Sequence, residues 1–230
     1  MNIQFTYALI LAGSIAGPLA LSFDKKVAFH TKWTDVIKAG ILPAAIFIAW
    51  DMFFTKEGVW SFSEKHITGI KIGNLPIEEA LFFFVVPFCC LFIYECIRCW
   101  FPSIRGEKLS EKILIVLGVA LFVAGLLNTG KYYTSWTGIA NGIFIALIFL
   151  APKLFCDFRV NYFLVSYAVI LIPFLTVNGL LTSIPVVLYN DAENLALRIY
   201  TIPTEDVFYG MLLILMNITI YERLRAGKKS

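Results

Sequence analysis

The chain has 230 residues, of which 59% are hydrophobic and only 15% are charged, and its net charge is +3. Soluble domains carry about 25% charged residues, so this composition excludes an ordinary soluble domain. The few basic residues are scattered over short loops, which excludes the dense basic patch of a nucleic-acid-binding protein, and we expect no nucleic-acid partner.

Apolar runs of about twenty residues recur along the chain, and runs of this length are typical of transmembrane helices. The alternating pattern of a membrane β-barrel is absent from the sequence. We therefore predict an all-α, polytopic membrane protein. The first run lacks a basic N-terminal region, which favours a retained span over a cleaved signal. The predicted spans are residues 3–21, 35–54, 77–97, 111–129, 133–151, 160–178 and 205–221.

The basic residues predict how the spans are oriented. Thirteen lysines and arginines fall in the loops around 22–38, 98–112 and 152–159 and in the C-terminal tail, whereas five fall in the opposite loops. By the positive-inside rule, the first group faces the cytoplasm. The N-terminus is then outside and the C-terminus cytoplasmic, in the cell (inner) membrane.

Cofactor motifs are sparse. Cys96 and Cys99 form a CxxC pair, but no second pair and no nearby histidine completes a zinc set, so we expect no metal. No glycine-rich nucleotide fingerprint follows a strand, so we expect no tightly bound dinucleotide. A reduced flavin that acts without redox turnover remains open.

A shift of 127 residues superimposes the second half of the sequence on the first. The chain is therefore interpreted as two three-helix units, residues 1–105 and 132–230, joined by a linker helix in 106–131. Because the linker helix restores the direction of the chain, the two units run parallel, related by an axis along the membrane normal. The shift places Asp51 on Asn178, Phe62 on Tyr189, Pro76 on Pro203, Glu78 on Glu205, Glu79 on Asp206 and Phe82 on Tyr209.

Each unit places two adjacent carboxylates at the start of its third span, in PIEE at 76–79 and PTED at 203–206. One such motif alone is an ordinary helix start, with proline in the first position and an acid near the free N–H groups. The duplication in register, with a polar residue in the preceding span each time, favours a site instead. Adjacent residues of a helix point about 100° apart, so at most one acid of each pair faces the middle of the bundle.

The repeated PIEE and PTED motifs, each opening a helix, resemble those of the lycopene cyclase domain family over about residues 2–222. Members are small membrane carotenoid cyclases, made as two three-span polypeptides, as one fused chain, or fused to phytoene synthase in fungi. This chain resembles the fused, stand-alone form. It has Asp206 where the first unit has Glu79, and Asn178 where the first unit has Asp51. The two halves are therefore expected to differ chemically.

The resemblance implies acid-catalysed, non-redox cyclisation of the linear ends of lycopene to β-rings, giving γ-carotene and β-carotene. Such a reaction needs a protonated carboxyl group, stabilisation of a carbocation, a base, and exclusion of water. We assign Glu78 and Glu205 as the preferred acid and base, Glu79 and Asp206 as their charge partners, and Asp51 as a further candidate. The expected substrate-binding residues are Asn178, Trp50, Phe82, Phe83, Phe208 and Tyr209.

The substrate is expected to enter from the lipid, since lycopene is wholly apolar, and contact with other carotenoid enzymes is also expected. Two alternatives remain: a cyclase of this family that acts on an elongated C50 carotenoid, and a small proton-coupled transporter. A transporter would need acids nearer the centre of the bilayer, and the stretches 81–93 and 209–216 contain none. The ring type, the number of ends cyclised and the oligomeric state stay open.

Overall fold

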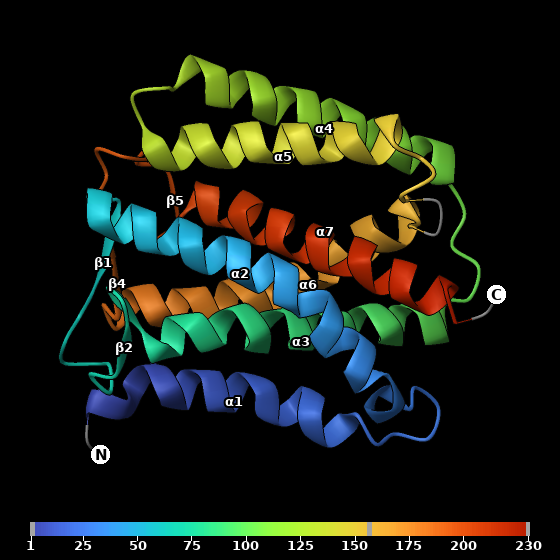
Figure 1. The fold of residues 1–230 in the computed structure, drawn as a ribbon, viewed down its shortest axis with the longest axis horizontal. Helices are drawn as coiled ribbons and strands as arrows, with labels where there is room; N and C mark the ends of the chain where they lie inside the picture. The colour runs from blue at the N-terminus through green and yellow to red at the C-terminus, as the bar shows by residue number, and fades with distance from the viewer. Residues whose placement is uncertain (1–2, 156–157, 229–230) are drawn as a thin grey trace.

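The computed structural model describes residues 3–155 and 158–228 and shows long helices with short strands at one end of the bundle (Figure 1). Within these residues, seven helices are long and apolar enough to cross a membrane, which confirms the predicted polytopic all-α fold. The helices are α1 Thr6–Leu21, α2 Trp33–Glu57, α3 Ile77–Trp100, α4 Glu107–Leu127, α5 Tyr132–Leu150, α6 Val160–Ser183 and α7 Thr204–Ala226, with 3₁₀ turns at Ile3–Phe5 and Phe29–Lys32.

Several helices extend beyond the predicted spans. The predicted second span ends at residue 54, but α2 continues to Glu57 and ends at Gly58, whose φ of 75° suits glycine. Likewise, α6 continues to Ser183 rather than 178. An apolar run stops at the first polar residues, whereas helical hydrogen bonding continues through them. Asp51 and Asn178 therefore lie inside their helices, although the predicted sixth span ends at residue 178.

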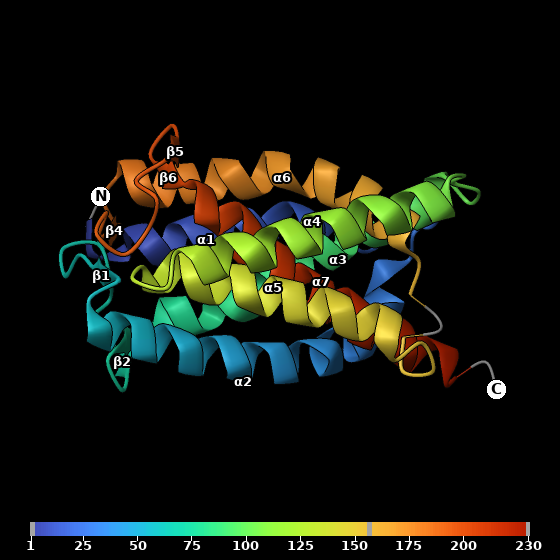
Figure 2. The same ribbon diagram turned by 90° about the horizontal axis from the view of Figure 1, so that it is seen from above.

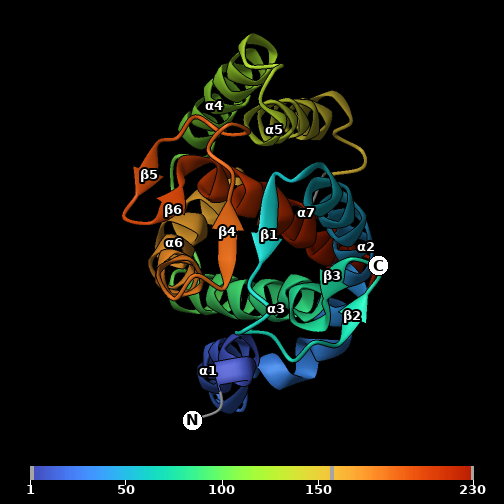
Figure 3. The same cartoon turned by 90° about the vertical axis from the view of Figure 1, so that its left-hand side faces the viewer.

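Helices α3 and α7 form the centre of the bundle and are its most buried spans among the described residues. Helices α2 and α6 lie on opposite sides and each packs against both central helices (Figure 3). Helix α1 packs on α3, α5 packs on α7, and α4 covers the outside of α5 (Figure 2). The two central helices run in the same direction, as the parallel arrangement of units predicts.

The strands connect the two halves at the end of the bundle where α3 and α7 begin. Strand β1 (Trp60–Phe62) pairs antiparallel with β4 (Val187–Tyr189), which starts 127 residues later. Each central helix is preceded by a small hairpin, β2 (Lys71–Ile72) with β3 (Leu75–Pro76), and β5 (Arg198–Ile199) with β6 (Ile202–Pro203). The sequence analysis missed these strands because two or three residues are too few to show a period. We call β1 and β4 the roof ribbon.

The opposite end of the bundle is held by a second repeated motif that the sequence analysis overlooked, YECIR at 94–98 and YERLR at 221–225. Arg98 of α3 pairs with Glu222 of α7, and Arg225 of α7 pairs with Glu95 of α3. The exchange is reciprocal, because the four residues occupy equivalent positions in the two halves. We call these four residues the inter-repeat clasp.

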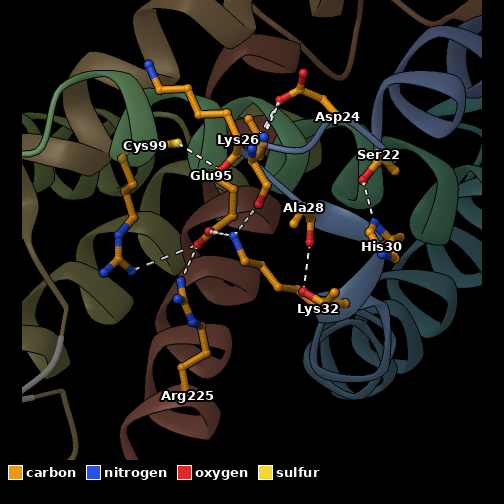
Figure 4. A network of polar contacts seen from close by, with 12 residues as sticks. Ser22, Asp24, Lys26, Ala28, His30, Lys32, Glu95, Cys99 and Arg225 are labelled. Atoms are coloured by element: carbon orange, nitrogen blue, oxygen red, sulfur yellow. Dashed lines mark hydrogen bonds and ion pairs between the residues drawn. The ribbon is translucent and has the colours of Figure 1, made fainter.

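The environment of the clasp makes its ion pairs stronger than surface pairs. Only 3% of the Glu95 side chain is exposed, and its Oε2 atom also lies 2.5 Å from Lys32 Nζ (Figure 4). The guanidinium groups of Arg98 and Arg225 stack over Tyr94 and Tyr221 of their own helices. The clasp and the roof ribbon therefore tie the two halves together at both ends of the bundle. The boundaries of the two three-helix units, 1–105 and 132–230, stay a prediction.

We predict that Arg98→Ala lowers the free energy of unfolding by about 2 kcal/mol, because the buried Glu222 carboxylate loses its partner. Lys71→Ala, which breaks the exposed pair with Glu64, should change it by less than about 1 kcal/mol. Denaturant unfolding in detergent micelles measures both variants. The exchange Arg98→Glu with Glu222→Arg should restore stability, and equal effects of the two alanine variants would contradict the clasp.

Candidate active site

A cavity of about 40 Å³ lies directly under the roof ribbon, between α3 and α7. Both halves of the chain line it. Three acidic side chains face it, Asp51, Glu79 and Asp206, and all three are at most 8% exposed. Its other walls are mostly aromatic, from Trp60, Phe62, Phe82, Tyr133, Tyr189 and Tyr209.

Asp51 and Glu79 form one acidic pair. The Tyr209 hydroxyl donates to Asp51 Oδ1 at 2.6 Å, and the Tyr7 hydroxyl donates to Glu79 Oε2 at 2.7 Å. The two carboxyl groups also lie close enough for their charges to act on each other. Two adjacent buried carboxylates repel each other, and a proton held by one of them relieves this repulsion. The pair is therefore a candidate proton donor in an apolar bundle.

Asp206 lies near this pair but has different partners. The Tyr133 hydroxyl donates to Oδ1 at 2.5 Å and the Tyr189 hydroxyl donates to Oδ2 at 2.9 Å. Burial raises the pKa of Tyr189 well above its usual value, and the Asp206 charge adds to the rise, so Tyr189 keeps the proton that it donates. Both oxygens of Asp206 therefore accept a hydrogen bond, and two tyrosines hold this carboxyl group in place.

Glu78 and Glu205, the preferred acid and base of the sequence analysis, are buried but face the loops beside the cavity. The backbone N–H of Thr68 donates to Glu78 at 2.7 Å, and that of Leu195 donates to Glu205 at 2.8 Å. The Thr134 hydroxyl also donates to Glu205. Both acids therefore bind equivalent loops through backbone N–H groups. This geometry fits the expectation that at most one acid of each pair faces the middle of the bundle.

Helix α3 begins directly after Pro76, at Ile77. Pro76 precedes the first helical residue instead of occupying it, with extended backbone angles of φ −58° and ψ 145°. The helix therefore begins one residue later than the ordinary start with proline in the first position, and Glu79 takes the third helical position. Glu78 Oε2 is buried with no hydrogen-bond partner among the described residues.

The predicted substrate-binding residues divide between the cavity and its surroundings. Phe82, Asn178 and Tyr209 line the cavity. Trp50 lies behind Tyr209, with ring centroids 5.4 Å apart, and Phe83 packs against Phe47 at 5.7 Å. Phe208 lies outside the lining, and its carbonyl accepts from Asn141.

Four aromatic rings enclose the space beside the acids, and we call Trp60, Tyr133, Tyr189 and Tyr209 the aromatic cage. The ring of Trp60 lies 5.1 Å from Tyr133 and 6.0 Å from Tyr209, and Tyr133 stacks on Tyr189 at 5.9 Å. Aromatic faces attract cations. The cage can therefore stabilise positive charge next to the carboxyl groups.

Sequence reasoning missed the tyrosines that hold the acids, namely Tyr7, Tyr133 and Tyr189. Tyr7 and Tyr133 are 126 residues apart, and their backbone N–H groups donate to the equivalent carbonyls of His66 and Glu193. A search for repeats with a one-residue gap would have paired them. The 127-residue shift aligned Tyr189 with Phe62, but phenylalanine has no hydroxyl group, so the alignment gave no sign that Tyr189 donates to an acid.

Comparison with known proteins identifies the family. The profile of the family described as lycopene cyclase matches residues 4–97 and 130–224, which is most of the chain. The chain belongs to the lycopene cyclase family. All three cavity acids lie inside the matched segments. Within the described residues, no group of three histidine, cysteine or acidic side chains is placed to hold a metal.

Two curated relatives carry the name bifunctional lycopene cyclase/phytoene synthase. The one from Pyrenophora tritici-repentis is 32% identical over 93 residues, which is 39% of this chain and 16% of the relative. The one from Aspergillus oryzae is 22% identical over 175 residues, 66% of this chain and 28% of the relative. The chain thus matches less than a third of the length of either relative. No solved structure matches it.

We predict that Glu79→Gln weakens the infrared C=O band of protonated carboxyl groups at neutral pH, because the shared proton is lost with the pair. Glu78→Gln should leave this band unchanged, since Glu78 accepts from a backbone N–H instead. Infrared spectra of the two purified variants and the unmodified protein make the comparison. An unchanged band in Glu79→Gln would show that Asp51 and Glu79 share no proton.

Proposed function

We propose that this protein is a membrane carotenoid cyclase that converts the linear end groups of lycopene to β-rings by acid catalysis. The observation that carries the proposal is the buried cavity itself, in which three carboxyl groups meet four aromatic rings. Membership of the lycopene cyclase family supports the substrate class. The reaction forms one carbon–carbon bond and leaves the molecular formula unchanged, so it is an isomerisation without redox change.

The Asp51–Glu79 pair is the proposed proton donor. Its proton adds to the terminal double bond of the end group and leaves a tertiary carbocation. A neighbouring double bond attacks this centre, which closes the six-membered ring and moves the positive charge into it. The pair suits this step because it keeps a proton in a place where carbon, rather than water, is the available acceptor.

Asp206 is the proposed base and counter-charge. Its two tyrosine donors hold the carboxylate in place, and loss of a ring proton to this group completes the alkene. The faces of the aromatic cage stabilise the cation without offering a nucleophile that would trap it. This division of labour gives the two halves different tasks, as Asp51 and Asn178 at equivalent positions already suggest.

Water must be kept from the cation, and the roof ribbon supports this requirement. Trp60 and Phe62 of β1 pair with Tyr189 and Val187 of β4, and all four side chains line the cavity. The ribbon therefore places apolar surface between the acids and the adjacent aqueous phase. At about 40 Å³ the cavity is smaller than a carotenoid end group, so binding requires its lining side chains to move apart.

The proposed setting is the inner membrane, with the roof ribbon on the outer side. The basic clasp end would then face the cytoplasm, in agreement with the positive-inside rule. Lycopene would reach the site from the lipid phase, and contact with other carotenoid enzymes belongs to the same proposal.

We predict that Glu79→Gln and Asp206→Asn each lower lycopene conversion by about 10²–10⁴-fold, the range typical of a lost general acid or base. Expression in a lycopene-accumulating bacterium, with pigments separated by chromatography, measures the yield of cyclic carotenoids. Glu78→Gln and Glu205→Gln are the matched controls and should keep most of the activity, because they change loop contacts. The reverse pattern would return the acid and base roles to Glu78 and Glu205.

A further inference from the structure

An apolar groove of about 160 Å³ lies between α1, α3 and α6. It is lined by Ser14 of α1, by Cys89 and Cys90 of α3 and by Val177 of α6, among others, and the neighbouring Pro173 is exposed on the outside of the bundle. Among the described residues, no charged side chain lines it. In a membrane, this groove would face the acyl chains.

The groove adjoins the acid cavity. Phe174 and Asn178 line both spaces. The Asn178 amide donates to the Phe174 carbonyl at 3.0 Å, so its N–H group is satisfied within the helix. From Asn178 to Ile170, the α6 wall of the groove extends over about 12 Å at the helical rise of 1.5 Å per residue. A chain lying in the groove would therefore end beside the carboxyl groups.

The equivalent place in the other half, between α5, α7 and α2, contains larger side chains. Val177 corresponds to Trp50, Cys89 to Met216, and Pro18 to Phe144 with the one-residue gap of the first helices. Trp50 packs there against Trp136 and Tyr209, with ring centroids 6.0 Å and 5.4 Å apart. The groove between α1, α3 and α6 is thus open, whereas aromatic rings fill the equivalent place between α5, α7 and α2.

A second asymmetry lies where the groove meets the cavity. Phe174 is 7% exposed, and its ring lies so close to Gly210 that a Cβ atom there would collide with it. The equivalent pair in the other half is Phe47 and Phe83, two rings packed at 5.7 Å. Glycine at 210 therefore provides the space that the Phe174 ring occupies between the groove and the cavity.

We infer that the groove between α1, α3 and α6 holds the polyene chain of the carotenoid, with Phe174 turning aside to admit the end group to the cavity. The inference rests on the proposed function and adds the route and the resting place of the substrate. Its basis is that an uncharged groove shares two lining residues with the acid cavity, and that Trp50 fills the equivalent place in the other half. The substrate would enter from one side of the bundle, so each end of a molecule would react in a separate binding event.

The test fills the groove with the larger side chains that the other half of the chain has at the equivalent positions. Val177→Trp places in α6 the residue that α2 has at the equivalent position, and Cys89→Met does the same in α3. Ile172→Trp is the matched control, because Ile172 lies on the same helix and is 71% exposed outside the groove. All variants are expressed in a lycopene-accumulating bacterium, and the amount of detergent-extracted protein is measured for each.

We expect Val177→Trp to lower the yield of cyclic carotenoid at least tenfold per amount of protein, Cys89→Met to lower it less, and Ile172→Trp to leave it unchanged. A second readout is independent of turnover: lycopene that co-purifies with Glu79→Gln should be lost when Val177→Trp is added.

Unchanged conversion and unchanged pigment in the Val177→Trp variants would overturn the inference and leave a groove filled by lipid only. If Val177→Trp is not extracted in folded form, the Cys89→Met variant decides in the same way. Failure of the unmodified protein to convert lycopene would instead overturn the proposed function, and the inference with it.

Discussion

The structure depends on the burial of three carboxyl groups between α3 and α7. Asp51, Glu79 and Asp206 lie in an apolar bundle, where isolated charges are costly. Four tyrosine hydroxyls donate hydrogen bonds to them. The roof ribbon and the clasp hold the two central helices at both ends, so the carboxyl groups of one half stay beside those of the other. A proton kept in such a place can be given to carbon.

The repeat explains how one site can hold both the proposed acid and the proposed base. Duplication places Glu79 and Asp206 at equivalent positions, and small differences separate their surroundings. Asp51 lies beside Glu79, whereas the equivalent Asn178 donates its amide N–H to the Phe174 carbonyl of its own helix. Asp206 instead accepts from Tyr189, where the first half has Phe62. The two halves also differ at Val177 and Trp50, which are equivalent positions. The groove is open at Val177, whereas Trp50 fills the equivalent place.

The sequence predicted the seven helices and the repeat, because long apolar runs and a constant shift are properties that a single sequence displays. It also placed Glu79, Asp206, Asp51 and Tyr209 among the candidates. It preferred Glu78 and Glu205 because they are equivalent in the two halves, whereas Glu79 and Asp206 line the cavity. Equivalence holds for both pairs of acids, so it does not tell which acid of each pair faces inward. The tyrosine donors and the short strands depend on contacts between distant segments, which the spacing of residues along the chain does not encode.

The most direct measurement is an experimental structure of the Glu79→Gln protein with lycopene bound. The account predicts an end group inside the aromatic cage, with its terminal double bond in contact with the amide at position 79 and its ring-forming carbons toward Asp206. An end group lying against Glu78 or Glu205 in the loops, with the cavity under the roof ribbon still closed, would contradict it.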